Sequence, residues 1–117
     1  ALKPVPSPYL VNGKLSEAAL RGEKIYKKAG CADCHPAPLF TDMKHYNIGT
    51  SSGLDENKDY DTPTLVEAWR TAPYLVDGRA ANMLEVLGKF NPGDKHGATS
   101  KLTDAERADL AEYVLSQ

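Results

Sequence analysis

Cys31-Ala32-Asp33-Cys34-His35 is the stretch of sequence that decides how this chain is organised. A Cys-x-x-Cys-His run is the pattern by which a c-type haem is attached covalently. In such a site both thiols bond to the haem, and the imidazole of the histidine becomes the proximal ligand of the iron. The motif therefore predicts one covalent haem c, held by Cys31, Cys34 and His35.

Three other interpretations of the motif compete with this one. A structural zinc site needs four protein ligands, and beyond the motif the chain offers only His45, His96 and carboxylates. A thioredoxin-like dithiol is expected at a helix start within a βαβ pattern, yet no Val/Ile-rich strand precedes Cys31. A disulfide between Cys31 and Cys34 would close a very small loop and stabilise little. The haem interpretation alone uses His35 together with both thiols.

Length and charge indicate a single domain that binds neither nucleic acid nor an anionic membrane surface. The chain has 117 residues and a formal net charge of −2, so it lacks a strong positive field. No apolar run reaches the roughly 18 residues of a spanning helix, which predicts no transmembrane segment. The first residues do not form a signal peptide. Because haem is attached to this motif outside the bacterial cytoplasm, we expect a periplasmic or otherwise extracytoplasmic location and a removed leader or preceding domain.

Helix signals are clearest near the two ends of the chain. Ser16 is expected to cap a helix over residues 17–29, with Gly30 at the C′ position that follows it. A capping box, Thr103-Asp104-Ala105-Glu106, predicts a last helix over residues 103–116.

Gly22 lies inside the first of these helices, where glycine costs about 1 kcal/mol relative to alanine. Such a position favours the close approach of another backbone. We therefore expect Gly22 and Tyr26 to cross the last helix near Leu110 and Tyr113.

The remaining segments predict a mostly α domain over residues 16–117. Residues 65–70 and 80–88 are expected to form two short helices, and residues 47–63, rich in turn formers, a long loop. Residues 1–15 contain the alternating prolines Pro4, Pro6 and Pro8. Because alternating prolines favour an extended chain, this segment is expected to form a proline-rich tail or linker.

The chain resembles known haem proteins at two levels. Gly22-Glu23-Lys24-Ile25-Tyr26 before the motif, with Leu110 and Tyr113 near the other end, resembles the class I cytochrome c fold. Four runs in the middle are similar to the C-terminal haem domain of the di-haem cytochrome c peroxidase/MauG family: Pro38-Leu39-Phe40-Thr41-Asp42, His45-Tyr46-Asn47-Ile48-Gly49-Thr50, Tyr60-Asp61-Thr62-Pro63-Thr64-Leu65 and Arg70-Thr71-Ala72-Pro73-Tyr74-Leu75-Val76-Asp77-Gly78-Arg79-Ala80. The resemblance implies an all-α cytochrome c fold with crossed N- and C-terminal helices, two short middle helices and long loops around one haem.

The resemblance also implies a function. In that family the C-terminal haem domain accepts or relays electrons, while peroxide reacts at a second haem in the N-terminal domain. This chain has one Cys-x-x-Cys-His run, so what carries over is single-electron transfer by a non-enzymatic domain with a redox protein partner or a fused redox domain. The alternatives are a small haem peroxidase and a ligand-binding sensor, each with an open or weakly held distal site.

Four residues are candidates for the sixth iron ligand. The position of the family's distal methionine falls on Phe90, whose side chain cannot bind iron. His96 lies in the loop before the last helix, the region that supplies the ligand in class I cytochromes c, and we predict that it is the ligand. Met83, Met43 and His45 are the alternatives. A bis-histidine haem would be low-spin, with a lower potential than a His/Met centre.

Five further side chains are candidates for contacts with the haem. Arg70 and Arg79 are expected to pair with the propionates, because guanidinium binds carboxylate through two hydrogen bonds. Trp69 and Tyr74 are expected to pack on the porphyrin, and Phe40 to belong to the apolar wall that excludes water.

Overall fold

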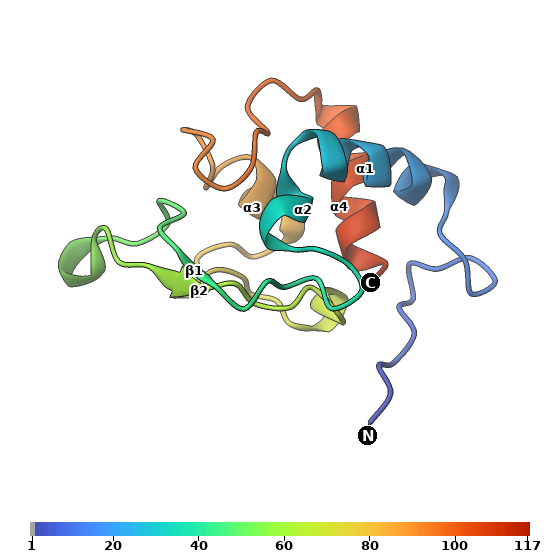
Figure 1. Cartoon of the computed structure of the whole chain (residues 1–117). Helices are drawn as coiled ribbons and strands as arrows, with labels where there is room; N and C mark the ends of the chain where they lie inside the picture. The colour runs from blue at the N-terminus through green and yellow to red at the C-terminus, as the bar shows by residue number, and fades with distance from the viewer. Residues whose placement is uncertain (1) are drawn as a thin grey trace.

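A computed structural model describes residues 2–117, and Ala1 lies outside the described residues. The chain is mainly helical, with two very short strands (Figure 1). In order, its elements are α1 (Glu17–Lys28), α2 (Cys31–Cys34), β1 (His45–Tyr46), the 3₁₀ helix η1 (Gly53–Asp55), β2 (Tyr60–Asp61), the 3₁₀ helix η2 (Ala68–Arg70), α3 (Met83–Leu87) and α4 (Asp104–Leu115). Within residues 2–117, no helix has the length and apolar character needed to span a bilayer.

The two long helices form where the capping signals predict them. The Ser16 side chain accepts a hydrogen bond of 3.1 Å from the backbone N–H of Ala19, at the start of α1. Gly30 follows the end of this helix with a φ of 80°, the left-handed conformation for which glycine is suited. At the start of α4, the Thr103 side chain accepts a hydrogen bond of 3.1 Å from the N–H of Glu106. Both predicted helices are therefore confirmed, together with their capping residues.

Helices α1 and α4 pack against each other in the core (Figure 1). A β-carbon added to Gly22 would lie 1.9 Å from the carbonyl oxygen of Asp109 and 2.9 Å from Cβ of Tyr113, so the helix backbones approach closely at this glycine. The rings of Tyr26 and Tyr113 pack edge to face, with centroids 5.0 Å apart. At the surface, Arg21 donates two hydrogen bonds to the Asp109 carboxylate, at 2.7 and 2.9 Å.

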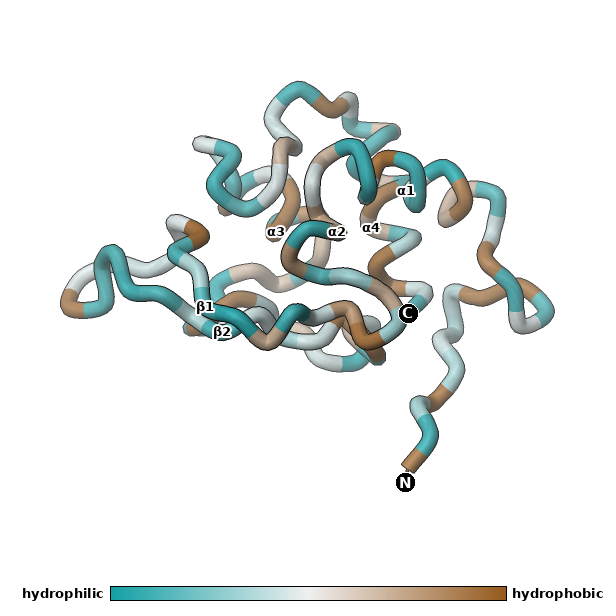
Figure 2. Tube along the Cα trace, in the orientation of Figure 1, coloured by the Kyte–Doolittle hydropathy of each residue, from teal (hydrophilic) through white to brown (hydrophobic). Residues whose placement is uncertain are grey.

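The middle of the chain corrects three expectations. The helix expected over residues 65–70 is reduced to η2, and the one expected over 80–88 is the shorter α3, which begins after Asn82. Strands β1 and β2 pair antiparallel, although the chain was expected to contain no sheet. Each strand has two residues, too few to produce an alternating hydrophobic pattern. The loop around η1, between the strands, is largely hydrophilic (Figure 2).

The segment before α1 contacts the other end of the chain. The backbone N–H of Val5 donates a 2.5 Å hydrogen bond to the Glu67 side chain. The buried hydroxyl of Ser7 donates one of 2.5 Å to the carbonyl of Leu115, at the end of α4. This proline-rich segment therefore lies along the surface beside α4 and η2.

Candidate haem site

A cavity of about 530 Å³ lies beside the Cys-x-x-Cys-His motif. This volume is within the range of small-molecule and cofactor sites. Cys31, Cys34 and His35 all line the cavity. Much of the remaining wall is apolar, with side chains from the middle of the chain, α3 and α4: Leu65, Ala68, Leu75, Val76, Met83, Val86, Leu87 and Val114.

Helix α2 brings both cysteines to one side of this cavity. It is a single turn that follows Gly30, and the N–H of His35 donates a 2.9 Å hydrogen bond to the carbonyl of Cys31. Cys31 and Cys34 are not joined in a disulfide. Burial raises the pKa of the Cys31 thiol to about 11, so this thiol is protonated at neutral pH.

Two hydrogen bonds fix His35, one to its side chain and one to its backbone. Its Nδ1–H donates a 2.9 Å hydrogen bond to the carbonyl of Phe40, which can only accept, so Nε2 is the nitrogen left free for a metal. The Tyr26 hydroxyl donates a 2.5 Å hydrogen bond to the carbonyl of His35. Burial lowers the pKa of His35. The imidazole is therefore neutral at neutral pH, the form that binds metal ions.

His96 lines the same cavity from the loop between α3 and α4. The centroids of the His35 and His96 rings are 6.4 Å apart, and the ring planes are tilted by 45°. Burial, and then the charge of His35, lower the pKa of His96 to about 4. Two neutral imidazoles thus lie close together in the cavity wall.

The other candidate iron ligands are placed differently. Met83, from α3, is buried in the core and lines the cavity. Met43 is 78% exposed, and His45 is an exposed residue of β1; neither lines the cavity. The structure therefore brings His96 and Met83, but not Met43 or His45, to the cavity.

The aromatic residues predicted to contact the haem fall into two groups. Tyr74 lines the cavity, and its hydroxyl donates a 2.7 Å hydrogen bond to the carbonyl of Ala68. Trp69 and Phe40 are not part of the cavity wall. Phe40 packs behind it against Tyr26, with ring centroids 6.2 Å apart.

Both arginines predicted to bind propionates lie outside the cavity wall. Arg70 pairs with Glu67 and its guanidinium lies 5.7 Å from the centroid of the Trp69 ring. Arg79 pairs with Asp77 at 2.7 Å. Each guanidinium is thus already engaged by a carboxylate, and a role for either arginine in binding propionate stays a prediction.

Several polar residues of the wall were not assigned a role from sequence: Tyr46, Tyr60 and Lys95. The Tyr46 hydroxyl donates a 2.6 Å hydrogen bond to Asp42, which holds the pKa of Asp42 at about 2 and raises that of Tyr46 to about 12. The Tyr60 hydroxyl is buried and has no hydrogen-bond partner within residues 2–117. Tyr60 belongs to one of the runs that carry the family resemblance, which was the available signal. The lysine in the wall suits a ligand with carboxylates.

These features fit a haem c better than a metal ion alone. The attachment thiols, two neutral imidazoles and an apolar wall all belong to one cavity. Across residues 2–117, no three or more His, Cys, Asp or Glu side chains are grouped so as to hold a metal ion.

Comparison with known proteins agrees with the assignment of a haem site. The cytochrome c family profile matches residues 19–117. The gamma subunit of hydrazine synthase from Kuenenia stuttgartiensis is 30% identical over 159 aligned residues, covering 97% of this chain and 45% of the relative. A solved structure of hydrazine synthase from that organism superimposes with a TM-score of 0.87 at 30% identity, covering all of this chain and 52% of the other.

Two further relatives have names that match the family resemblance. The cytochrome-c peroxidase IdrP1 of Denitromonas iodatirespirans is 29% identical over 150 residues, covering 86% of this chain and 40% of the relative. The methylamine utilization protein MauG of Methylorubrum extorquens is 30% identical over 117 residues, covering 82% of this chain and 33% of the relative. The chain thus spans less than half the length of these curated relatives. It belongs to the cytochrome c family and is a haem domain related to those of the peroxidase/MauG proteins.

Proposed function

We propose that this domain transfers single electrons through one haem c ligated by His35 and His96. The observation that carries the proposal is the spacing of the two imidazoles. A bond from metal to imidazole nitrogen is about 2.0 Å long, and that nitrogen lies about 1.1 Å from the ring centre, so two rings on opposite sides of one metal have centroids about 6.2 Å apart. The rings of His35 and His96 are 6.4 Å apart.

Each part of the motif has a role in holding the cofactor. Cys31 and Cys34 would bind it through their sulfur atoms, and His35 would present Nε2 to the iron. The hydrogen bond from Nδ1 to the Phe40 carbonyl fixes the tautomer and orientation of this ring. Tyr26 holds the neighbouring backbone through its bond to the His35 carbonyl.

The cavity wall supports a carrier rather than a catalyst. A bound haem would supply a one-electron Fe(III)/Fe(II) couple. Apolar residues such as Leu65, Leu75 and Val86 would exclude water, and His96 would leave no open position for a substrate. Two imidazole ligands favour a lower potential than a His/Met pair, because a methionine ligand raises the potential.

The test is the spectrum of the holoprotein and of His96→Ala. We expect the oxidised wild type to be low-spin, and the reduced wild type to bind carbon monoxide slowly because His96 must first dissociate. In His96→Ala we expect a high-spin spectrum and rapid binding of carbon monoxide. His45→Ala is the matched control: the same change at an exposed histidine outside the cavity should leave both properties unchanged.

Two results would contradict this assignment. A weak far-red sulfur-to-iron band in the wild type, lost in Met83→Leu, would assign the ligand to Met83. Rapid binding of carbon monoxide by the reduced wild type would indicate an open distal site and favour a small peroxidase or a sensor.

Location, partner and helix arrangement complete the proposal. We place the domain outside the cytoplasm, where haem is attached to such motifs in bacteria. The greater length of the relatives supports a redox partner or a fused redox domain. The close approach at Gly22 supports a crossing of α1 and α4 at this residue.

A further inference from the structure

The loop that carries His96 is folded around one buried amide. This amide belongs to Asn91, a buried residue that is only 3% exposed. Its Nδ2 donates to the carbonyl oxygens of His96 at 3.0 Å and Gly97 at 2.8 Å, and to the Thr99 hydroxyl at 2.8 Å. Its Oδ1 accepts a 3.0 Å hydrogen bond from the backbone N–H of His96. A single side chain therefore binds both backbone polar groups of His96.

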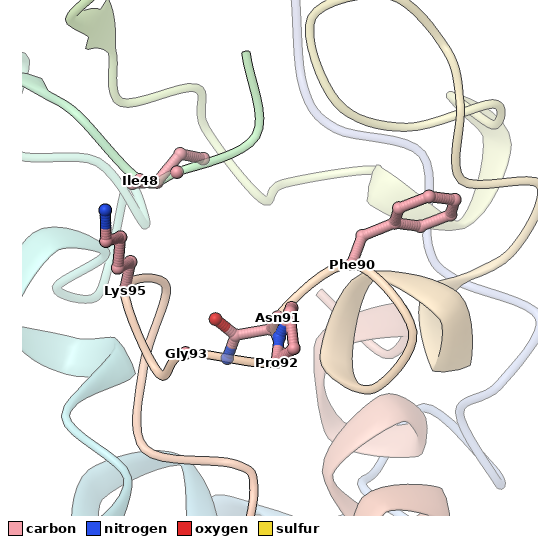
Figure 3. Close-up of a pocket in the computed structure, with 7 residues that line it drawn as sticks. Ile48, Phe90, Asn91, Pro92, Gly93 and Lys95 are labelled. Carbon is pink, nitrogen blue, oxygen red and sulfur yellow. The ribbon is translucent and has the colours of Figure 1, made fainter. Parts of the chain in front are cut away.

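No regular secondary structure takes over this role. Residues 88–103 lie between α3 and α4, and the N–H and C=O of His96 make no other hydrogen bond within residues 2–117. Figure 3 shows Asn91 next to Pro92 and Gly93, on the segment that leads to Lys95. These residues, with Ile48 and Gly49, also line a smaller cavity of about 200 Å³. Beside this open space, His96 depends on Asn91 for its backbone hydrogen bonds.

The same loop is attached to the end of α1, next to the haem-binding motif. The N–H of Ala98 donates a 2.9 Å hydrogen bond to the carbonyl of Ala29. The Asp94 carboxylate accepts hydrogen bonds from the N–H groups of Thr99 at 3.0 Å and Ser100 at 2.8 Å. The segment just after His96 is therefore fixed by other residues, whereas the backbone of His96 itself is held by Asn91.

We propose that Asn91 is a positioning residue that keeps the His96 imidazole directed at His35 and so sets the rate at which His96 leaves the iron. This inference rests on the proposed ligation by His96. Replacing Asn91 removes the hydrogen bonds on both sides of His96 but leaves the cavity wall, the attachment cysteines and the contacts of His35 in place. The effect should appear in ligand exchange before it appears in cofactor attachment.

The experiment measures binding of carbon monoxide to the reduced holoprotein at rising concentrations of the gas. At saturation the rate becomes the dissociation rate of His96, which reports on the loop directly. We expect Asn91→Ala to raise this limiting rate at least about tenfold. Tenfold corresponds to about 1.4 kcal/mol, which matches the net loss of one or two hydrogen bonds.

Asn91→Asp provides a second, nearly isosteric variant. Its carboxylate at neutral pH still accepts from the His96 N–H but cannot donate to the three acceptors, so the limiting rate should again rise at least about tenfold. Ser16→Ala is the control for general destabilisation. It removes the capping hydrogen bond of α1, which should lower the unfolding temperature without changing the limiting rate.

The outcomes separate this inference from the proposed function. If His96→Ala leaves the low-spin spectrum unchanged, ligation by His96 is wrong and the role of Asn91 fails with it. If His96→Ala becomes high-spin but both Asn91 variants keep the wild-type limiting rate, ligation stands and the positioning role is overturned. If Ser16→Ala raises the limiting rate as much as the Asn91 variants do, the effect is a general loss of stability and the inference is also overturned.

Discussion

Gly22→Ala tests the packing of α1 on α4 at one atom. The added methyl group would be centred 1.9 Å from the carbonyl oxygen of Asp109, whereas ordinary contacts begin at 3.4 Å. The deficit is about 1.5 Å, and the obstructing atom belongs to the backbone, so no side-chain rotation relieves it. The helices must separate, which disturbs the packing of Tyr26 on Tyr113.

Gly22→Ala changes the stability in two opposing ways, through helix propensity and through overpacking, and the second effect is larger. Alanine is favoured over glycine within a helix by about 1 kcal/mol. Overpacking a core costs about 1 to 3 kcal/mol, and occasionally more; a collision of backbone with backbone belongs at or above the upper end of this range. We therefore expect a net loss of about 2 to 3 kcal/mol. For a domain of this size, that corresponds to a fall in Tm of about 8 to 12 °C.

The assay is thermal unfolding of the holoprotein followed by circular dichroism. Lys24→Ala is the matched control, because it places alanine on the exposed side of the same helix, where we expect a change within about 0.5 kcal/mol. A Tm for Gly22→Ala equal to that of the wild type, or above it, would show that the glycine is not required for close packing and would refute the proposed crossing at this residue.

Three further predictions concern hydrogen bonds that do not involve the side chains of the proposed iron ligands. The hydrogen bond from Tyr46 holds the pKa of Asp42 at about 2, below its ordinary value of about 3.9. Asp42 should therefore stabilise the folded state above about pH 4, and this contribution should be lost as the pH falls toward 2. In urea unfolding between pH 5 and 2, we expect the midpoint of Asp42→Asn to fall less steeply than that of the wild type. Tyr26→Phe leaves the buried carbonyl of His35 without its donor and should cost about 1 to 3 kcal/mol in urea unfolding at pH 7; an unchanged midpoint would show that water replaces the hydroxyl. Thr103→Ala removes the N-cap of α4 and should cost about 1 kcal/mol, which Thr103→Ser should largely avoid in the same measurement.

Local signals explain why the long helices could be predicted from sequence. The side chains of Ser16 and Thr103 each accept a hydrogen bond from the backbone N–H three residues ahead. Gly30 adopts the left-handed conformation that ends α1. Each effect depends on a few neighbouring residues, which a sequence displays directly. The bounds of α1 and α4 accordingly lie within a residue of the expected ones at each end.

The middle of the chain depends on contacts between distant residues. Strands β1 and β2 pair across a loop of more than ten residues and carry too little pattern of their own. Residues expected to form a helix from 65 to 70 instead provide η2, where the N–H of Glu67 donates to the carbonyl of Gln117 at the far end of the chain. Tertiary contacts override local helix propensity at such places.

In the candidate site too, some side chains could be assigned a role from local sequence, and others could not because their role depends on distant residues. The attachment motif could be recognised from five consecutive residues, because the chemistry requires their spacing. The properties of Asn91 and Tyr60 could not, because each depends on which hydrogen-bond partners are present or missing nearby. Within residues 2–117, Asn91 matters because the backbone of His96 has no other partner, and Tyr60 because its buried hydroxyl has none. Sequence displays the donors and acceptors of a chain, but which of them lack partners is determined only when distant segments pack together.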